Sequence, residues 1–365
     1  MNRRERFMET MTFGKPDRPA SADYFYYEST RKRWESEGLP VGVDLDEYFG
    51  MDFNPFRWKA PVDVYELVPA FETTVLEQTE DSETVRRSGG EVVRILRNVP
   101  PPAMPHWVSY PVKSREEWKD YRKRLEGNTP GRHAEKLRAL AAKEGERDYP
   151  LGMWLGGTYG FMRSWWGVEG ISTLFYDDPA LIEEMVECLT RLSLEGLEAA
   201  LAAGIKLDWV MFWEDMAYKT GPLMSPTMYR RTCMPFYEKV MERVREAGIK
   251  VVMLDSDGNI EELIPLWLDV GVTVMHPMEV AAGMDVRAVR RRYGKKVGFF
   301  GGIDKRVLAS TPEEIRRTVE PILRELLGEG GFIPACDHAV PPDVSFSNYR
   351  YYRELVKKVS EEISG

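Results

Sequence analysis

The sequence predicts an α/β protein built as a single (β/α)8 TIM barrel, with a helical and β-meander embellishment near the N-terminus. From residue 150 onward, short continuous apolar runs alternate with amphipathic segments. This pattern is typical of parallel strands that are buried on both faces and joined by helices. A chain of 365 residues, 43% of them hydrophobic, is long enough for one such domain, which we expect to span 1–365. A doubly wound open sheet is the alternative.

The N-terminal part carries different patterns. Residues 2–12 form an amphipathic, charged segment that predicts a helix, and Pro19–Phe25 predicts a further strand. Residues 71–98 alternate polar and apolar side chains, which predicts an antiparallel meander. We expect this meander to be inserted into the barrel at about 60–110 as a lid. Ser114–Leu125 then begins with a capping serine and predicts a helix.

Six apolar runs supply the predicted barrel strands, and each is followed by a turn and a helix. Three of these helices have a strong start signal, a capping residue directly before a proline, as in Asp178-Pro179, Ser225-Pro226 and Thr311-Pro312. The runs begin near Leu151, Trp209, Lys250, Val272, Val297 and Gly331.

Composition excludes several classes of protein. The net charge of −9 argues against binding to nucleic acid or to an anionic membrane, and no apolar stretch is long enough to span a bilayer. The first residues are charged, without the apolar core of a secretion signal. The three cysteines, Cys188, Cys233 and Cys336, are far apart and form no CxxC pair. We therefore expect a cytoplasmic enzyme.

Acidic residues follow five successive predicted strands, at the ends where parallel α/β folds place their chemistry. Asp255 and Asp257 are two residues apart, so an extended chain would point both side chains into the barrel mouth. Two close carboxylates repel each other unless a cation or a shared proton compensates. The strand-end residues are Glu214, Asp215, Asp255, Asp257, His276, Glu279, Asp304, Lys305, Cys336, Asp337 and His338.

The predicted catalytic residues are Asp255, Asp257, Glu214 and Asp215. For substrate binding we predict Tyr159, Trp213, Arg31, His276 and Lys305. Some of these residue types also have ordinary structural roles, because Asp304 and Asp337 could cap helices and His276 could be a core histidine. Aromatic side chains could line the mouth or fill the core, namely Tyr24, Tyr26, Tyr27, Trp34, Tyr159, Trp165 and Trp166.

Long stretches of the chain resemble the uroporphyrinogen decarboxylase (URO-D) superfamily. The resemblance lies in NRRERFMETMTFGKPDRPA near the start, in residues 213–231, in LDSDGN (254–259), and in residues 283–310 and 330–352. It implies a (β/α)8 barrel. The superfamily includes the haem-pathway decarboxylase and corrinoid-dependent methyltransferases that methylate thiols. The chain resembles a branch of the superfamily near these methyltransferases.

The methyltransferase branch carries a zinc site, which the resemblance maps onto this chain with altered ligands. Its His-x-Cys pair corresponds to Asp255-x-Asp257, and its last cysteine to Cys336 or, with a shift of one, to Asp337. The resemblance thus implies a divalent metal, zinc among the candidates, held by Asp255, Asp257, Glu279, Cys336 and His338, with Glu214 or Asp215 reaching in. A metal-free acidic pocket for a cationic or hydroxyl-rich substrate is the alternative.

Three functions follow from these expectations. The first is methyl transfer to or from a small molecule, with the corrinoid on a separate partner protein. The second is decarboxylation or another lyase reaction, with Asp255 or Glu214 as acid/base and Lys305 or Arg306 holding a carboxylate. The decarboxylase's arginine-rich RQAGRY-type segment is replaced here by a stretch with Arg31 and Arg33. The third is a non-catalytic accessory barrel, with dispersed acids. A homodimer is a further possibility.

Overall fold

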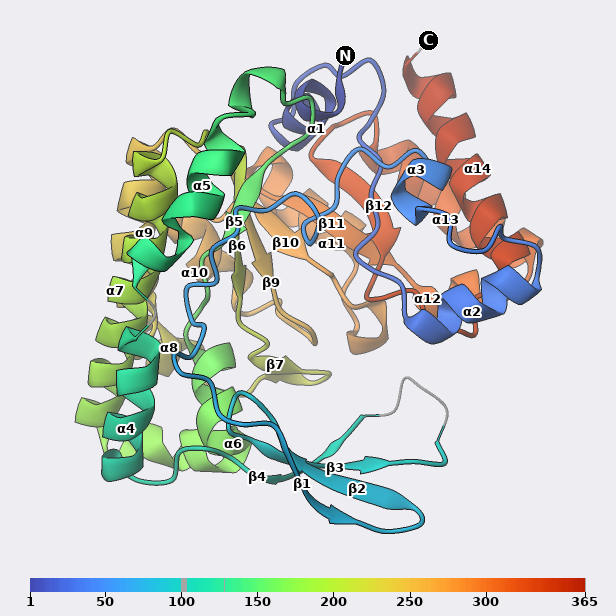
Figure 1. Cartoon of the computed structure of the whole chain (residues 1–365). Helices are drawn as coiled ribbons and strands as arrows, with labels where there is room; N and C mark the ends of the chain where they lie inside the picture. Colours follow the sequence, from blue (N-terminus) through green and yellow to red (C-terminus); the bar gives the residue numbers. More distant parts are fainter. Residues whose placement is uncertain (100–103, 128, 365) are drawn as a thin grey trace.

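A computed structural model describes residues 1–99, 104–127 and 129–364. At its centre lies a six-stranded parallel sheet in the order β12-β11-β10-β9-β6-β5 (Figure 1). All six strands coincide with the predicted apolar runs, and the predicted fold class is confirmed. The strands are β5 (Gly152–Trp154), β6 (Trp209–Trp213), β9 (Val251–Asp255), β10 (Val274–His276), β11 (Gly298–Ile303) and β12 (Phe332–Cys336).

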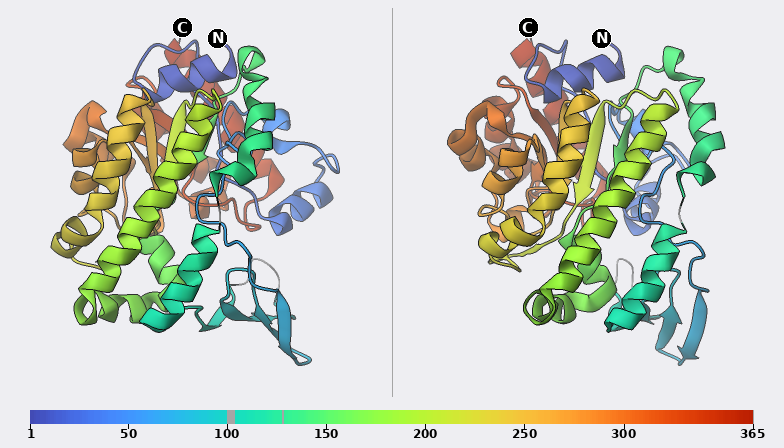
Figure 2. Two further views of the ribbon diagram at one scale, coloured as in Figure 1. Left: turned by 60° about the vertical axis from the view of Figure 1, so that its left-hand side comes forward. Right: turned by 90° about the vertical axis from the view of Figure 1, so that its left-hand side faces the viewer.

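Helices follow every strand and cover the outer face of the sheet, as the turned views show (Figure 2). Asp178, Ser225 and Thr311 cap three of them by accepting backbone hydrogen bonds, as the sequence predicts. The helices are α1 (Arg3–Met11), α2 (Glu28–Ser36), α3 (Leu45–Tyr48), α4 (Arg115–Glu126), α5 (Ala134–Ala141), α6 (Tyr159–Asp177), α7 (Pro179–Ala202), α8 (Pro226–Thr232), α9 (Met234–Glu246), α10 (Ile264–Val270), α11 (Val286–Tyr293), α12 (Lys305–Leu308), α13 (Pro312–Leu326) and α14 (Phe346–Ser364).

Alternate residues of each strand pack into two separate cores. Met211, Met253 and Ile333 belong to an inner cluster, whereas Phe212 and Leu254 belong to a larger outer cluster shared with the helices. Successive side chains of a strand point to opposite faces, so the inner cluster fills the concave side of the sheet. The inner cluster also contains residues of the N-terminal part, namely Phe7, Met11, Ala20, Ala22, Phe53 and Trp58.

Two N-terminal segments, 19–26 and 51–60, lie where a complete barrel would have its remaining two strands. Lys59 forms an isolated bridge to Gly152 of β5, and Ala22 forms another to Phe53. On the other side, the Asp23 carboxylate accepts a hydrogen bond from the backbone of Cys336 in β12. The barrel-type arrangement therefore has six regular strands and two irregular segments.

The predicted strand at Pro19–Phe25 is therefore wrong as a regular strand. Its backbone donors bind side chains in place of a neighbouring strand: the Ala20 N–H donates to Thr10 Oγ1 (2.9 Å) and the Ser21 N–H to Asp52 Oδ2 (2.9 Å). Side-chain acceptors compete with a ladder for the same donors, which leaves only single bridges.

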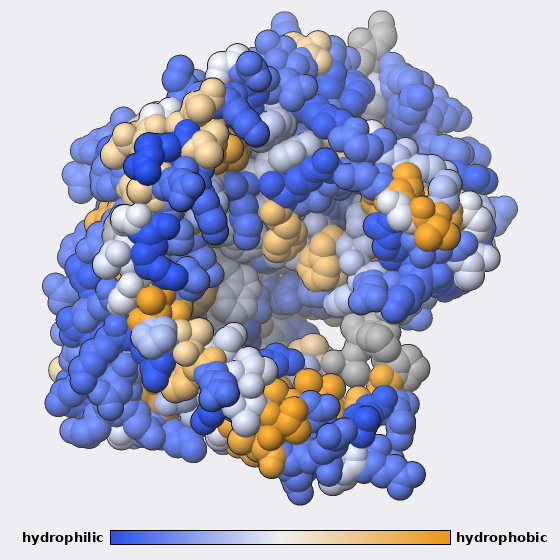
Figure 3. All heavy atoms as spheres, in the orientation of Figure 1, coloured by the Kyte–Doolittle hydropathy of each residue, from blue (hydrophilic) through white to orange (hydrophobic). Residues whose placement is uncertain are grey.

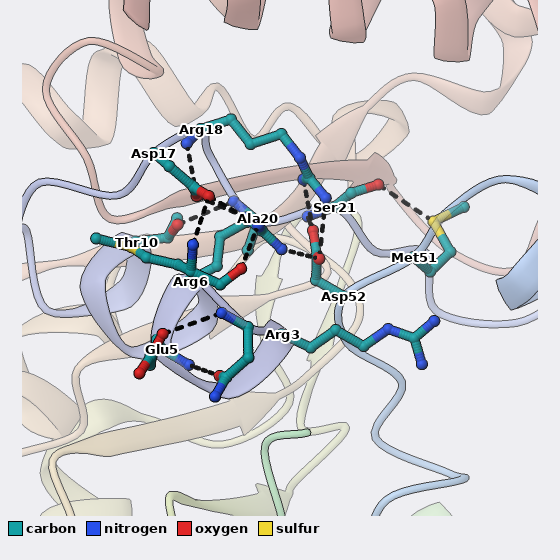
Figure 4. Close-up of polar contacts among 12 residues, drawn as sticks. Arg3, Glu5, Arg6, Thr10, Asp17, Arg18, Ala20, Ser21, Met51 and Asp52 are labelled. Atoms are coloured by element: carbon teal, nitrogen blue, oxygen red, sulfur yellow. Dashed lines mark hydrogen bonds and ion pairs between the residues drawn. The ribbon is translucent and has the colours of Figure 1, made fainter. Parts of the chain in front are cut away.

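Asp52 holds the two segments and helix α1 together at the N-terminal end of the sheet (Figure 4). Its buried carboxylate accepts from Arg6 Nη1 (2.7 Å), from both terminal nitrogens of Arg18 (2.6 and 3.0 Å) and from the Ser21 N–H. Each carboxylate oxygen thus accepts from a charged arginine donor. These hydrogen bonds offset the cost of burying the Asp52 charge.

The predicted meander exists as a four-stranded antiparallel sheet in the order β1-β2-β3-β4. It forms a lobe beyond the carboxyl ends of the parallel strands (Figure 1). The strands are β1 (Thr74–Gln78), β2 (Ser82–Arg86), β3 (Val92–Leu96) and β4 (His106–Ser109), and a two-stranded hairpin near the mouth consists of β7 (Ala217–Tyr218) and β8 (Gly221–Pro222). The role of the meander as a lid stays a prediction.

Among the helices of the described residues, none combines the length and apolar character that crossing a bilayer requires.

Candidate functional site

The last residues of β6, β9 and β10 lie side by side in the sheet, and all three are predicted site residues. Asp255 pairs with Trp213 on one side and with His276 on the other. The residue two positions earlier in each strand belongs to the inner cluster, so these three side chains face the same concave side. In the space-filling view, the surface is hollowed between the body and the β1–β4 lobe (Figure 3).

Three carboxylates meet at these strand ends. Asp215, Asp255 and Asp257 each offer an oxygen, and these oxygens lie within 4.8 Å of one another. Asp215 adopts a positive φ of 40°, which turns the chain after β6, and its Oδ1 accepts the Asp257 N–H at 3.2 Å. The predicted pair of Asp255 and Asp257 is therefore brought together, with Asp215 added to it. We call these three residues the acidic cluster.

Asp255 is the most buried member of the acidic cluster, with a side chain 6% exposed. Its Oδ2 accepts a hydrogen bond from the Tyr24 hydroxyl at 2.6 Å. Burial, followed by the charges of Asp215 and Asp257, raises the pKa of this carboxyl well above its usual range, and the Tyr24 hydrogen bond opposes the shift.

Asp257 is the member open to solvent, with 40% of its side chain exposed. Burial, with smaller contributions from Asp215 and Glu279, raises its pKa to about 7. His338 Nε2 lies 3.7 Å from Asp257 Oδ2. Glu279 joins the same region through its Oε2, which accepts the Gly258 N–H at 3.0 Å. Two predicted metal ligands therefore lie at the border of the acidic cluster.

His276 is fully buried beside Asp255 and presents an acceptor nitrogen to it. Burial lowers its pKa to about 3, so the ring is neutral. Its Nδ1 lies 2.7 Å from the Phe300 carbonyl oxygen, which can only accept, so Nδ1 carries the proton. Nε2 then carries a free lone pair and has no hydrogen-bond partner among the described residues. It lies 3.9 Å from Asp255 Oδ1.

Two cations at the mouth pair with acids in and around the acidic cluster. Arg163 of α6 donates to Asp215 Oδ2 at 2.7 Å. Lys305 Nζ lies 3.6 Å from Glu279 and 3.8 Å from Asp337. In the described chain, no lysine or arginine lies within 4.0 Å of Asp255 or Asp257. Two carboxylates are therefore without a cationic partner.

Other predicted residues lie outside the acidic cluster. Glu214 points into the helix layer, where it accepts from the Thr158 N–H and hydroxyl (both 2.7 Å), the Gly160 N–H (3.2 Å) and the Tyr237 hydroxyl. Burial raises its pKa, and these hydrogen bonds oppose the shift. Through these hydrogen bonds Glu214 anchors the start of α6.

Tyr159 and Cys336 are also buried on the helix side of the sheet, in or against the outer core. Arg31 donates to the Val43 carbonyl oxygen and to Glu35, and it lines a surface groove that Tyr24 also lines. Asp304 caps α12 by accepting the Arg306 N–H. This is the structural role expected from the sequence as the alternative to a site role for Asp304. The structure thus does not bring these side chains to the acidic cluster.

Sequence reasoning missed Arg163 altogether and gave Tyr24 only as one of several aromatic residues. Arg163 lies on the first turns of α6, and its contact with Asp215 depends on how the helix is oriented. No local pattern indicates either contact, because both join residues far apart in the chain.

Known proteins share both the sequence pattern and the fold. The uroporphyrinogen decarboxylase (URO-D) family matches residues 98–359. Curated relatives include the uroporphyrinogen decarboxylases of Thermus thermophilus, 29% identical over 199 residues and 52% of each chain, and of Coxiella burnetii, 24% identical over 193 residues, 51% of this chain and 50% of that one. The chain spans about half the length of the curated relatives it matches.

A solved structure described as a methyltransferase from Methanosarcina mazei has a similar fold, with a TM-score of 0.63, 15% identity, and coverage of 98% of this chain and 99% of that one. At this identity the likeness shows the fold alone. The family match covers more than half of the chain and agrees with the resemblance in the sequence motifs. The chain therefore belongs to the uroporphyrinogen decarboxylase (URO-D) family.

Proposed function

We propose that this protein is a methyl-transfer enzyme whose acidic cluster binds one divalent metal ion. The observation that carries the proposal is the convergence of Asp215, Asp255 and Asp257 within 4.8 Å, two of them without a lysine or arginine partner in the described chain. A divalent cation would relieve the repulsion between these carboxylates.

The donor set fits a divalent ion. Three carboxylate oxygens suit magnesium or manganese, and zinc also accepts carboxylate and imidazole ligands. The unpartnered Nε2 of buried, neutral His276 is the kind of nitrogen that such an ion binds. Glu279 and His338 lie next to the acidic cluster as further candidates. Cys336, packed in the outer core, is a less suitable ligand in this arrangement.

The chain's own residues would bind and orient the methyl acceptor. A bound divalent ion would lower the pKa of an acceptor thiol or hydroxyl. The acceptor's proton leaves to solvent on the open side of Asp257, and its sulfur or oxygen lone pair then forms the bond to the methyl carbon. The bond between that carbon and the donor breaks, and the donor keeps the electron pair. Trp213 and Lys305 would contact the acceptor beside the acidic cluster.

The methyl donor would be a corrinoid carried by a separate partner protein, as the family resemblance implies. The test uses free methylcobalamin, candidate thiols and the purified protein loaded with Zn²⁺ or Mn²⁺. We expect the methylcobalamin absorbance to fall in the presence of metal and thiol. We expect the absorbance to stay constant with Asp257→Asn. With Glu262→Gln, a change at an exposed carboxylate further along the chain, we expect it to fall at the rate of the unaltered protein. A metal-independent rate, or equal rates for the two variants, would reject the proposal.

Decarboxylation is the second candidate function. The pKa of Asp257 near 7 suits a proton donor at neutral pH, and Lys305, which lies 3.6 Å from Glu279, would hold a substrate carboxylate. The curated relatives carry the name of a decarboxylase. Release of carbon dioxide from a carboxylated substrate, without any use of methylcobalamin, would favour this function. The accessory-barrel alternative expects dispersed acids and is disfavoured by their convergence.

A further inference from the structure

One side chain of the N-terminal segment reaches into the acidic cluster from across the barrel mouth. The Tyr24 hydroxyl donates to Asp255 Oδ2 at 2.6 Å. Tyr24 belongs to segment 19–26, which is not a regular strand, whereas Asp255 is the last residue of β9 in the parallel sheet. The contact therefore connects an irregular part of the wall to the centre of the site.

The Tyr24 ring is fixed on several sides. Its centroid lies 4.2 Å from that of His276 and 4.9 Å from that of Phe56. Its backbone N–H donates to Asp23 Oδ1 at 3.2 Å, and the Asp23 carboxylate in turn accepts from Cys336 N–H and the Tyr349 hydroxyl. A ring held by packing and by its backbone aims its hydroxyl in one direction.

This hydroxyl decides which oxygen of Asp255 faces the site. Because Oδ2 is taken by Tyr24, Oδ1 is the oxygen that faces His276 Nε2, 3.9 Å away. The same ring packs on His276, whose other nitrogen is fixed by the Phe300 carbonyl. One carboxylate oxygen and one imidazole nitrogen are thereby held 3.9 Å apart.

We propose that Tyr24 is a positioning residue that orients Asp255 and His276 for metal binding, so that the N-terminal segment completes the site. The inference rests on the proposed metal site. Hydrogen bonds to ligand side chains fix their orientation, and losing one costs about 10- to 100-fold in metal affinity.

The chain contains a matched control two residues away. The Tyr26 hydroxyl bonds with the Tyr349 hydroxyl at 2.9 Å and contacts no member of the acidic cluster. Tyr24→Phe and Tyr26→Phe each remove one hydroxyl, keep the ring, and lie in the same segment. Thermal unfolding checks that both variants fold.

The experiment is a calorimetric titration of each folded protein with Mn²⁺ or Zn²⁺. We expect Tyr24→Phe to raise the Kd about 10- to 100-fold and Tyr26→Phe to change it less than twofold. In an Asp255→Ala background, Tyr24→Phe should change the Kd less than twofold, because the Tyr24 hydroxyl has then lost its acceptor. An unchanged Kd in Tyr24→Phe would overturn the inference while leaving the metal site intact. Absence of binding in the unaltered protein would instead reject the proposed function.

Discussion

At the scale of single residues, Asp257 is the member of the acidic cluster that exchanges a proton with solvent near neutral pH. Its side chain is the most exposed of the three, yet burial and neighbouring carboxylates raise its pKa to about 7. Near neutral pH the metal-free cluster thus holds a proton that an incoming ion must displace. His276, with a pKa of about 3, does not titrate in this range.

The pH dependence of metal binding follows from this proton. Below pH 7 the Asp257 carboxyl is mostly protonated, so we expect the affinity for Mn²⁺ to fall about tenfold per pH unit as the pH decreases from 7 to 5. Above pH 8 the dependence should weaken, because Asp257 has then lost its proton. Calorimetry in buffers of different ionisation enthalpy measures both the affinity and the released proton. An affinity that is constant from pH 5 to 8 would contradict the role given to Asp257.

Glu214 has a structural role that a conservative substitution can test. Glu214→Gln puts an amide N–H₂ among donors from Thr158, Gly160 and Tyr237, so we expect the free energy of unfolding to fall by about 2–3 kcal/mol. Glu238→Gln, on the exposed face of α9, should change it by less than about 0.5 kcal/mol. Denaturant titration compares the two, and equal stabilities would show that Glu214 does not anchor α6.

All three members of the acidic cluster are among the predicted catalytic residues, but so is Glu214, which lies outside the cluster. Asp255 and Asp257 are found together because they lie two apart at the end of a strand. Glu214 and Asp215 are neighbours, so their order alone does not tell which one faces the mouth. Glu214 follows inward-facing Trp213 and points outward, and the positive φ of Asp215 then returns its side chain to the site. Tyr24 and Arg163 reach the acidic cluster only through contacts between residues far apart in the chain.

At the scale of elements, β11 depends on a glycine where it approaches the loop after β10. Gly301 has a φ of 124°, and a Cβ there would lie 2.1 Å from the Pro277 carbonyl oxygen. The Gly302 N–H donates to that same oxygen at 2.9 Å. The strand and the loop are thus too close for any side chain at Gly301.

Replacing Gly301 should therefore disturb the strand end more than its backbone angle alone would. We expect Gly301→Ala to cost about 1–3 kcal/mol for overpacking, added to about 1–2 kcal/mol of backbone strain. Gly294→Ala, at a φ of 58° with open space around it, isolates the strain. Thermal or denaturant unfolding measures both variants. A Gly301→Ala protein as stable as Gly294→Ala would contradict the close approach.

Elements with their own hydrogen-bond ladders were predictable, and those without were not. The six continuous apolar runs become β5, β6 and β9–β12, and the alternating stretch becomes β1–β4. Segment 19–26 has an apolar pattern too, but Thr10 and Asp52 side chains accept its backbone hydrogen bonds. A sequence pattern shows which residues are apolar, not which distant side chain will take a backbone donor.

At the scale of the whole molecule, the two irregular segments and α1 depend on Asp52. Its side chain is 2% exposed and is the common acceptor for Arg6, Arg18 and the Ser21 N–H. These contacts join three parts of the chain at the end opposite the mouth (Figure 4). The same segment carries Tyr24, whose hydroxyl donates to Asp255 of the acidic cluster.

Loss of the Asp52 charge should loosen this connection. We expect Asp52→Asn to lower the free energy of unfolding by about 3 kcal/mol, because two arginines lose their buried partner. Asp17→Asn also removes an Arg6 partner, but Asp17 is 41% exposed, so we expect less than about 1 kcal/mol. Hydrogen exchange should show faster opening at residues 19–26 in Asp52→Asn only. Equal behaviour of the two variants would contradict the role of Asp52.

The most direct test of the whole account is equilibrium dialysis of the purified protein against Mn²⁺ or Zn²⁺ at pH 7.5. We predict one ion per chain, with affinity reduced at least about tenfold in Asp215→Asn, Asp255→Asn and Asp257→Asn, and unchanged in Glu262→Gln. No binding above background, or undiminished binding in all three cluster variants, would contradict a metal-dependent function for these carboxylates.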